Sequence, residues 1–434
     1  MKYQEFIFEN YQFNKETKEL ILNYSFDQKI NFSERYFFDF EISNFDKLLL
    51  DAAIQNLFFL AGISYFKLYP FAKIIVKNGS INSDSAKFLN KTYQKGLGEF
   101  FYINNLDPNF EINFPANSVA NIPINKSVDG QKLLIGIGGG KDSLVTVELL
   151  KKQNKNLAIW SVNNLEKLKP LIDKINLPFY YVERNWDKQL IELNKDTELY
   201  NGHIPISAIL AAVGSLIGVL SNNSDIIVSN ENSANEPTLN YQGVDINHQY
   251  SKSIEFESDW QNQSLRTTGE NIKYYSALRP FSEVAISKMF SKIGFNKYQK
   301  VFSSCNNAFT HYSDHLYWDG TCPKCAFIFL ALTPFLKRED LEELFSGKNL
   351  LLSDELIATY NQLLGIDPAK PLECVGEIKE SRMAMQLAFT IYPQLKDRYN
   401  FILPPDYNFE EVHQHLMPAN IFRSILDEST KLLN

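Results

Sequence analysis

The chain has 434 residues, of which 44% are hydrophobic and 22% are charged. This length predicts two or three domains with a sizeable core, and the composition excludes a disordered or fibrous chain. Lys and Arg number 43 against 51 Asp and Glu, which gives a net charge of −8. Sequence-independent binding to nucleic acid needs clustered cations that neutralise phosphates, so we expect no nucleic-acid partner, although one local basic site is compatible with this charge.

Cysteine usage and apolar runs predict a cytoplasmic protein. Four cysteines in a chain of this length do not build a disulfide scaffold. The first ten residues contain no apolar run of signal-peptide length. The longest uncharged apolar run, residues 204–220, is short for a membrane span and contains Pro205. We therefore expect residues 204–220 to form a buried helix, and we expect no membrane insertion.

Residues 1–127 are predicted to form an N-terminal α+β domain with an accessory or substrate-gripping role. Short aromatic runs at residues 3–8 and 36–42 are typical of strands, and residues 45–61 resemble a helix. Loop-forming residues separate these runs. We find no catalytic motif in this region.

Residues 128–336 alternate between strand-like and helix-like segments. The expected strands are residues 132–138, 157–162, 179–182 and 225–229, and the expected helices are residues 142–152, 165–175 and 204–220. Such alternation predicts an α/β fold with a doubly wound parallel sheet. Ligands of these sheets bind beyond the carboxyl ends of the strands. We therefore expect the catalytic site at those ends.

Residues 337–434 are predicted to form a mainly helical C-terminal region. The clearest helical candidates in it are residues 338–345 and 352–364. We find no sequence repeat with a period of 20–50 residues anywhere in the chain. The predicted organisation is therefore an N-terminal domain, a catalytic α/β domain and a helical C-terminal region.

A glycine-rich loop between an expected strand and an expected helix is the most specific feature of the sequence. The loop consists of Gly138, Gly139, Gly140, Lys141, Asp142 and Ser143. Its glycines let backbone N–H groups approach an anion, and the start of the following helix directs further N–H groups and its positive dipole end to the same place. Lys141 adds a cation, Ser143 adds a hydroxyl donor, and Asp142 offers a helix cap or a ligand for Mg²⁺. We interpret the loop as a pyrophosphate cradle; the alternative is a glycine-rich turn without a ligand.

Polar residues follow the expected strand at 225–229 and recur over the next fifty residues. The candidate site residues among them are Asn230, Glu231, Glu236, His248, Lys252 and Arg279. Carboxylates suit Mg²⁺, whereas lysine and arginine bind anionic substrates. A histidine binds an anion or carries a proton. The alternative is an ordinary solvated loop.

The cysteines suggest a metal site. Cys322 and Cys325 have the two-residue separation that is typical of a zinc knuckle, and Cys305 upstream offers a third thiolate. The sequence leaves the fourth ligand open among Asp319, His311, His315 and Cys374. The alternatives to a structural Zn²⁺ site are buried reduced cysteines and a knuckle that serves only partner binding.

The glycine loop resembles the S-G-G-x-D-S loop of the ATP pyrophosphatase superfamily, whose members cleave ATP to AMP and pyrophosphate. Gly138 stands where that motif usually has serine, so one hydroxyl contact to phosphate is missing. The loop matches neither the P-loop nor the dinucleotide fingerprint. The resemblance implies a PP-loop fold of the adenine nucleotide α-hydrolase type and implies ATP as a ligand.

Several motifs together resemble the ATP-dependent UDP-N-acetyl-α-D-muramoyl-L-alanyl-L-glutamate epimerases of bacterial peptidoglycan synthesis. They are GGGKDS, SNENSANE, NHQYSKS, RPFSE, CPKCAF and ECVGEIKESR. They lie between about residues 130 and 385, and the resemblance is weaker in residues 1–127. It implies a nucleotide-sugar dipeptide substrate, UDP-N-acetylmuramoyl-L-alanyl-L-glutamate, whose terminal glutamate is inverted to the D form. It also implies ATP and Mg²⁺.

The chemistry of glutamate agrees with this implication. The α-hydrogen of a free carboxylate is very weakly acidic, because the negative charge opposes a carbanion. A mixed anhydride with AMP carries no such charge, so its α-hydrogen is far more acidic. A base then removes the proton from one face and an acid returns a proton to the other face. Hydrolysis of the acyl-adenylate releases the product and AMP.

The sequence offers several candidates for each role. The proton-carrier candidates, without an order among them, are Glu231, His248, Lys252, Cys305 and Cys374, and Asp142 is expected to act in the activation step. Cys374 lies among carboxylates, so it is either a packing residue or a proton-transfer group. The residues expected to bind the substrate are Asn230, Glu236, Lys252, Arg279 and Arg382.

Other functions stay open from the sequence. One is another ATP pyrophosphatase, such as an enzyme similar to 7-cyano-7-deazaguanine synthases or a tRNA-thiolating enzyme, because nitrile synthases carry a zinc cluster in a similar place. The acidic net charge opposes the tRNA reading. Another is a nucleotide sensor, which would bind ATP without releasing pyrophosphate. The sequence does not fix the oligomeric state.

Overall fold

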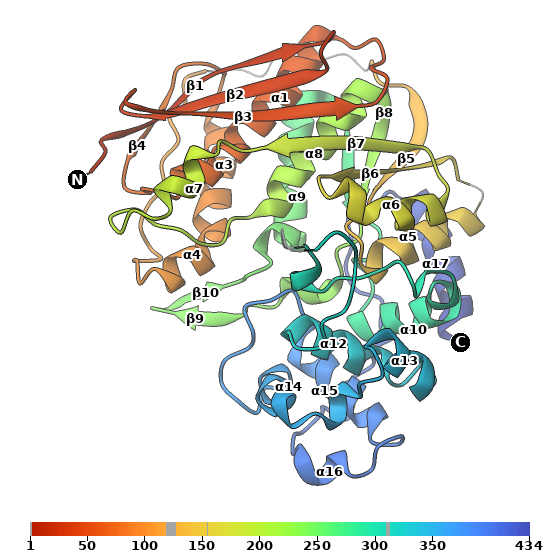
Figure 1. The fold of residues 1–434 in the computed structure, drawn as a ribbon. Coiled ribbons are helices and arrows are strands. Elements are labelled where there is room, and N and C mark those ends of the chain that lie inside the picture. Colours follow the sequence, from red (N-terminus) through yellow and green to blue (C-terminus); the bar gives the residue numbers. More distant parts are fainter. Residues whose placement is uncertain (1, 119–126, 154, 310–312) are drawn as a thin grey trace.

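One large sheet runs through the molecule in the computed structural model, which describes residues 2–118, 127–153, 155–309 and 313–434 (Figure 1). Within these residues nine strands pair in the order β11-β8-β5-β6-β7-β3-β2-β1-β4. The parallel part consists of β5 (Gly130–Gly136), β6 (Leu157–Val162), β7 (Phe179–Asn185), β8 (Asn223–Val228) and β11 (Lys273–Ser276). The predicted α/β class with a parallel core is confirmed.

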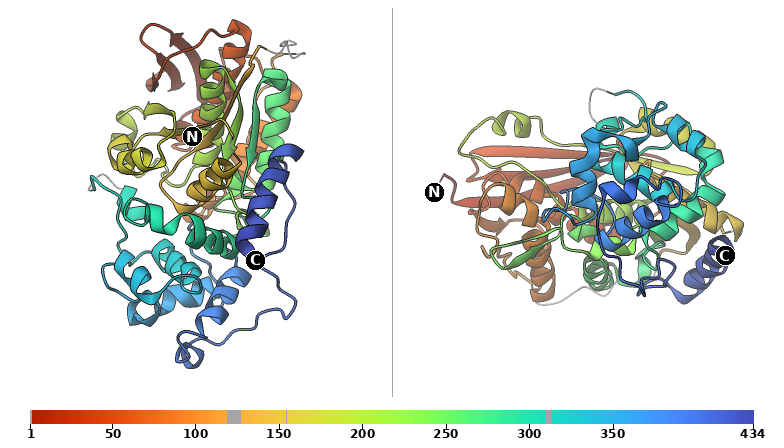
Figure 2. Two further views of the ribbon diagram at one scale, coloured as in Figure 1. Left: turned by 90° about the vertical axis from the view of Figure 1, so that its right-hand side faces the viewer. Right: turned by 90° about the horizontal axis from the view of Figure 1, so that it is seen from below.

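Helices cover both faces of the parallel strands. They are α5 (Lys141–Lys152), α6 (Leu165–Ile175), α8 (Ile206–Ser221), α9 (Ile254–Thr268) and α10 (Glu283–Ile293). Leu133 and Ile135 of β5 face the core formed with α5, α6 and α10, whereas Leu134 faces the core formed with α8 and α9. Because both faces are apolar, the strands are buried between two helical layers (Figure 2).

The order of the parallel strands creates a switch point. β5 has β6 on one side and β8 on the other. The chain leaves β5 into α5 on one face of the sheet, and it leaves β8 towards α9 on the opposite face. The two connections therefore separate at the carboxyl ends of β5 and β8, which is where open α/β sheets bind their ligands.

The N-terminal strands extend the same sheet. This region contains β1 (Glu5–Asn14), β2 (Glu19–Phe26), β3 (Ile30–Asp39), β4 (Lys73–Val76), α1 (Lys47–Ala61), α2 (Ile63–Phe66), α3 (Ser83–Gly96) and α4 (Gly98–Ile103). β3 pairs antiparallel with β7, and Phe38 lies opposite Val182. The strand predicted at 3–8 is confirmed within β1, whereas the one predicted at 36–42 is displaced, because β3 ends at Asp39. The domain boundary at residue 127 stays a prediction, although the sheet crosses it.

Most of the remaining elements lie in the lower part of Figure 1. They are α7 (Gln189–Leu193), β9 (Leu239–Tyr241), β10 (Val244–Ile246), α11 (Phe295–Tyr298), α12 (Pro323–Leu332), α13 (Arg338–Leu344), α14 (Ile357–Leu363), α15 (Ile378–Ala388), α16 (Leu395–Arg398) and α17 (Ala419–Leu433). The helix predicted at 352–364 is wrong in its first turn and begins at Ile357. Two short 3₁₀ turns, Leu350–Leu352 and Asp354–Leu356, precede it, and Ser353 between them is extended.

Two helical stretches are apolar enough that their burial must be compared with that of a membrane span. Residues 204–220, predicted to be a buried helix, form most of α8, whose residues from Ala211 to Ser221 are all buried. Lys47–Phe66 is long and apolar enough to cross a membrane by length and composition alone. However, 78% of its apolar window is buried inside the protein, as in the core helix of a globular fold.

A buried ion pair joins the antiparallel and parallel parts of the sheet. Arg184 on β7 donates from Nε to Oε1 of Glu34 on β3 over 2.7 Å, and its Nη2 donates to Ser64 Oγ over 2.9 Å. The Tyr36 hydroxyl donates to the same Glu34 oxygen over 2.5 Å. The two charged side chains are 3% and 0% exposed. Removal of one charge would therefore leave the other charge buried without a partner.

We predict that Glu34→Gln destabilises the protein by about 3–5 kcal/mol, because Arg184 would keep its buried charge without a counter-charge. The matched control is Glu19→Gln, which breaks the exposed pair between Glu19 and Arg35 on neighbouring strands. Exposed pairs contribute no more than about 1 kcal/mol. Urea denaturation followed by circular dichroism measures both changes, and equal losses in the two variants would contradict the prediction.

Candidate functional site

The glycine loop leaves the carboxyl end of β5 and starts α5. Gly139 has a φ of +95°, which side-chain-bearing residues rarely adopt, and a Cβ atom there would lie 3.0 Å from the Ser303 carbonyl oxygen. Gly140 is the N-cap of α5, so the free N–H groups of the first helical turn point out of the loop. A Cβ atom at Gly138 would meet nothing within 4 Å. The loop therefore requires glycine at 139 and leaves open space at 138.

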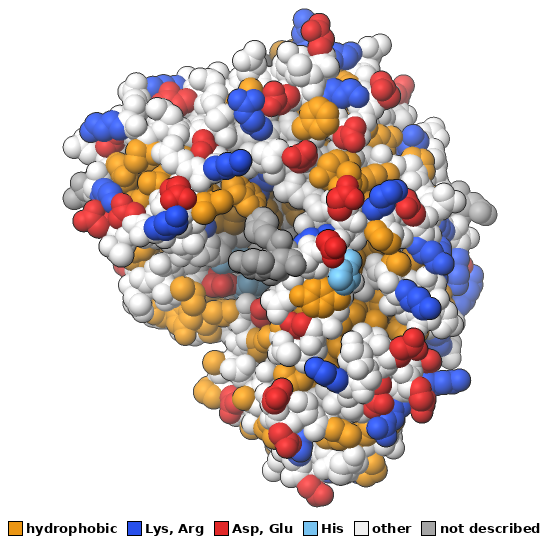
Figure 3. Space-filling model, in the orientation of Figure 1, with side chains coloured by type: hydrophobic (Ala, Val, Ile, Leu, Met, Phe, Trp, Pro, Cys, Tyr) orange, Lys and Arg blue, Asp and Glu red, His pale blue; other side chains and the backbone are white. Residues whose placement is uncertain are grey.

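A cavity of about 420 Å³ lies beyond the ends of β5 and β8. Among the predicted site residues, its lining includes Gly138, Gly140, Asp142, Ser143, Asn230, Glu231, Lys252 and Cys374. Its volume is in the range of small-ligand and cofactor sites. Figure 3 shows that this face of the molecule is hollowed between the upper part, which contains the sheet, and the lower helical part. The structure thus brings most of the predicted residues to one place.

Carboxylates gather at the floor of the cavity. Asp142, Glu231 and Glu283 each offer an oxygen, and these oxygens lie within 4.8 Å of one another. Lys141 is 1% exposed, and its Nζ lies 2.5 Å from Asp142 Oδ1 and also bonds to Glu283. Burial would lower the pKa of Lys141, but the two carboxylates outweigh burial and raise it. Lys141 therefore stays charged beneath the loop and does not line the cavity, which differs from its predicted phosphate contact.

Cys374 and Lys252 form a second charged group on the cavity wall. Cys374 lies in the loop before α15, and Lys252 ends the turn Tyr250–Lys252, with its Nζ 3.2 Å from Cys374 Sγ. Burial alone would raise the pKa of the Cys374 thiol, but Lys252, His248 and Lys324 lower it to about 6. At neutral pH the sulfur is therefore a thiolate, which is a nucleophile and a base.

A histidine pair lies behind this thiolate. The Nδ1 atom of His248 bonds to Glu99 Oε2, and the rings of His248 and His203 lie 4.5 Å apart between centroids. Burial opposes a charge on His248, but Cys374 and Glu99 raise its pKa to about 9. Burial and the neighbouring His248 lower the pKa of His203 to about 4. Hence, near pH 7, His248 is an imidazolium and His203 is neutral.

The structure gives Arg279 a different role from the predicted substrate contact. Its guanidinium is fully buried, and Nη2 lies 3.0 Å from Oε2 of Glu257. It also donates to the backbone carbonyl oxygens of Glu231, over 2.6 Å, and of Lys252. Because its donors are used inside the protein, Arg279 positions the segments that carry Glu231 and Lys252.

Glu236 and Arg382 do not reach the main cavity. They line a separate shallow depression. Glu236 pairs with Lys370 over 2.6 Å. The Arg382 guanidinium donates to the carbonyl oxygens of Leu364 and Ile402 over 2.7 and 2.9 Å. Their contact with the substrate stays a prediction, and at these positions it would lie outside the main cavity.

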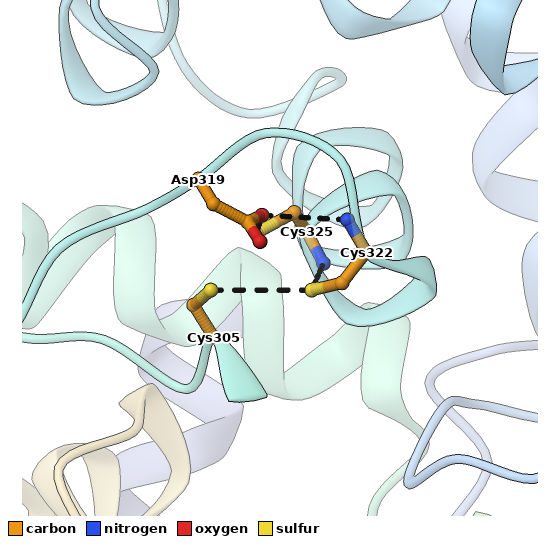
Figure 4. A group of neighbouring side chains, drawn as sticks. All are labelled: Cys305, Asp319, Cys322 and Cys325. Atoms are coloured by element: carbon orange, nitrogen blue, oxygen red, sulfur yellow. Dashed lines mark hydrogen bonds between the residues drawn. The ribbon is translucent and has the colours of Figure 1, made fainter. Parts of the chain in front are cut away.

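The three cysteines of the predicted cluster lie together, and Asp319, one of the candidates for the fourth ligand, lies with them. Cys305, Asp319, Cys322 and Cys325 converge, as Figure 4 shows. Cys374 lies with Lys252 instead. The exposed ring of His315 bonds to its neighbour Asp314. His311 lies outside the described residues.

Sequence reasoning missed several residues of the site. They are Glu99, His203, Glu283 and Lys324. Glu283 ends the RPFSE run and begins α10 beside the glycine loop, so its motif contained a usable signal. Glu99 lies in α4, about 150 residues before its partner His248, and no local pattern marks it.

Comparisons with known proteins agree with this arrangement. A family model of the MurL N-terminal domain matches residues 1–277, and a model of the MurL C-terminal domain matches residues 301–398. A curated protein of Xanthomonas oryzae pv. oryzae, named UDP-N-acetyl-alpha-D-muramoyl-L-alanyl-L-glutamate epimerase, is 34% identical over 80% of this chain and 76% of its own length. Equally named proteins are similar: that of Salinispora tropica is 35% identical over 78% of this chain and 73% of its own length. The protein of a Micromonospora species is 34% identical over 78% of this chain and 75% of its own length.

We predict that Cys374 is alkylated by iodoacetamide with a midpoint near pH 6, because Lys252 and His248 stabilise its thiolate. The rate should rise as the pH increases through that value, since the thiolate is the reactive form. Lys252→Met removes the cation at 3.2 Å, so the midpoint should move to higher pH. Peptide mapping by mass spectrometry separates Cys374 from the other cysteines.

The matched control for this experiment is Lys370→Met, which removes a lysine that pairs with Glu236 outside the cavity. It should leave the midpoint of Cys374 unchanged. A midpoint near that of an ordinary thiol in the unaltered chain, or the same midpoint in Lys252→Met, would contradict the prediction.

Proposed function

The chain belongs to the MurL family, and from this membership we infer that it is the epimerase that inverts the terminal L-glutamate of UDP-N-acetyl-α-D-muramoyl-L-alanyl-L-glutamate in peptidoglycan synthesis. It is therefore an isomerase that acts on an amino-acid derivative. The observation that carries this inference is the extent of the similarity, since three relatives with that name align over about four fifths of the chain.

We propose that ATP is a substrate and that its phosphates bind at the glycine loop. In support, the first turn of α5 presents free N–H groups at the switch point of the sheet, beside the cavity. The strand order β11-β8-β5-β6-β7 suits a PP-loop fold of the adenine nucleotide α-hydrolase type. Asp142, Glu231 and Glu283 offer the hard oxygen ligands that would hold Mg²⁺, which would neutralise charge on the phosphates.

Activation of the substrate as an adenylate would make the epimerisation feasible. A carboxylate oxygen of the terminal glutamate attacks the α-phosphorus of ATP, and the bond to the β-phosphate breaks, which releases pyrophosphate. The resulting mixed anhydride lacks the negative charge that opposed loss of the α-proton. After proton exchange, water cleaves the anhydride and releases AMP. The residues of the chain act by holding the triphosphate in line with the carboxylate.

We propose that Cys374 is one of the two proton carriers. Its sulfur lines the same cavity as the glycine loop, and Lys252 at 3.2 Å keeps it ionised. The thiolate takes the α-proton from one face of the activated glutamate. His248, charged through Glu99, stabilises the thiolate from behind. The carrier on the opposite face is another residue of the cavity. Of the predicted candidates that line it, Lys252 lies beside Cys374, so we propose Glu231.

The surface and the cysteines favour this function over the alternatives. On the face shown in Figure 3, acidic and basic side chains are interspersed, whereas a tRNA-modifying enzyme needs a continuous basic stripe. The four described cysteines carry free thiols. We therefore propose that the enzyme works in the cytoplasm, where thiols stay reduced.

The glycine loop gives a direct test of ATP binding. Gly139→Ala should weaken ATP binding at least about tenfold, because its φ of +95° strains any side-chain-bearing residue and the added methyl group meets the Ser303 carbonyl. Gly138→Ala introduces the same methyl group into open space and is the matched control. Isothermal titration calorimetry with ATP and Mg²⁺ measures both. Absence of ATP binding by the unaltered chain, or equal losses in both variants, would overturn the assignment of the loop.

A second experiment separates activation from proton transfer. In D₂O with ATP, Mg²⁺ and the L-glutamate substrate, the chain should form the D-glutamate product with deuterium at the α-carbon, together with AMP and pyrophosphate. Cys374→Ala should lower epimerisation by at least ~10²-fold, since a positioned acid–base group contributes that much. It should keep the substrate-dependent exchange of labelled pyrophosphate into ATP, because that reaction needs only the activation step.

Asp142→Asn serves as the reverse control, because Asp142 belongs to the carboxylate group beside the phosphates. This variant should lose both the isotope exchange and the epimerisation. Unchanged epimerisation by Cys374→Ala would exclude the thiol as a proton carrier. Loss of the exchange in Cys374→Ala alone would place the cysteine in activation instead.

A further inference from the structure

Four potential metal ligands converge in a cluster that does not include Cys374. We define the cysteine–aspartate cluster as Cys305, Asp319, Cys322 and Cys325. One ligand atom of each lies within 4.8 Å of the others. Figure 4 shows the four side chains pointing toward one another from two separate chain segments. Soft thiolates with one carboxylate are a ligand set that suits Zn²⁺.

The distances in the cluster fit a shared metal ion. Cys305 Sγ and Cys322 Sγ lie 4.0 Å apart. Tetrahedral zinc with Zn–S bonds of about 2.3 Å places its sulfur ligands about 3.8 Å apart. A disulfide would need a separation of about 2.05 Å. Asp319 Oδ1 approaches Cys325 Sγ to 3.1 Å, which places the carboxylate as the fourth corner.

The backbone around the cluster holds the ligands in this geometry. Cys322 is the N-cap of α12, and its sulfur accepts a hydrogen bond from the Cys325 N–H over 3.4 Å. Asp319 Oδ1 accepts from the Thr321 N–H over 2.8 Å, while Oδ2 bonds to the Asn307 amide. The Cys322 N–H also donates to Asp319 Oδ1, over 3.3 Å.

The cluster also lies against the wall of the nucleotide cavity. Cys305 follows Ser303, whose N–H donates to the Gly139 carbonyl over 3.0 Å. Its neighbours Ser304 and Asn306 line the cavity, and so does Lys324, which lies between Cys322 and Cys325. A metal ion at the cluster would thus tie the segment beside the glycine loop to the start of α12.

We propose that Cys305, Asp319, Cys322 and Cys325 bind one structural Zn²⁺ ion that fixes this wall of the cavity. Asp319 is the fourth ligand that the sequence left open. Cys374 is not one of the four ligands, since its sulfur bonds to Lys252. This proposal does not rest on the epimerase reaction, so measurements of metal binding test it independently.

Metal content tests the site directly. The full chain, purified without chelators, should contain one zinc per chain by inductively coupled plasma mass spectrometry. Cys322→Ser keeps an N-cap for α12 but removes a thiolate, and it should lose the zinc. Cys374→Ser removes the one described cysteine outside the cluster and should keep it. A chain that neither contains zinc nor binds added zinc, or retention of full zinc by Cys322→Ser, would overturn the proposal.

Cobalt substitution tests the ligand set. Co²⁺ in the same site should show a thiolate-to-metal charge-transfer band, and Asp319→Cys should raise its intensity by about a third, because three thiolates become four. An unchanged band in Asp319→Cys would exclude Asp319 as the fourth ligand.

Hydrogen exchange tests the role of the ion in the cavity wall. Removal of the ion should speed amide exchange in residues 303–309 and at the glycine loop. Unchanged exchange there would exclude the role in the cavity wall.

Discussion

The site depends on the paths that the chain takes after β5 and β8. These neighbouring parallel strands send their connections to opposite faces of the sheet. The backbone between them is therefore uncovered, and the first turn of α5 keeps N–H groups that no carbonyl of its own helix satisfies. Gly139 makes the turn possible, because its positive φ lets the chain pass against Ser303. The cavity lined by Asp142, Glu231, Lys252 and Cys374 lies at these strand ends.

Charged side chains around the ends of β5 and β8 form ion pairs within the protein. Lys141 lies between Asp142 and Glu283, and Arg279 is held by Glu257. Such buried pairs add little net stability, but they fix the positions of their partners because breaking them is costly. The carboxylates thus face the cavity in a defined arrangement. A rigid charged frame of this kind suits a reaction in which phosphate oxygens and a carboxylate must be aligned.

The charged group around Cys374 is assembled from three distant parts of the chain. Glu99 comes from the N-terminal region, Lys252 from the segment before α9, and Cys374 from the loop before α15. Each shifts the charge of the next, since Glu99 supports the imidazolium of His248 and the cations support the thiolate. The N-terminal region therefore contributes to this charged group. It extends the central sheet through β3 and supplies the carboxylate that bonds to His248.

Features that depend on residues close together in the chain could be predicted from the sequence. Apolar alternation with helices predicted the parallel core, and the run from Gly138 to Ser143 predicted a loop with free N–H groups, because these follow from local backbone preferences. The spacing of Cys322 and Cys325 likewise suggested a metal site. Local patterns misplaced Lys141 and Arg279, since both look like anion-binding cations in the sequence and become buried partners of carboxylates only in the folded protein.

Which residues from distant parts of the chain come into contact is known from the folded structure alone. It brings Asp319 to the cysteine cluster and Cys374 to Lys252, joins Glu99 to His248, and shows that the N-terminal strands extend the central sheet. A contact between residues far apart in the chain leaves no periodicity or spacing in the sequence. The ionisation of Cys374 shows the same limit, because it is set by charges and burial that exist only after the chain has folded.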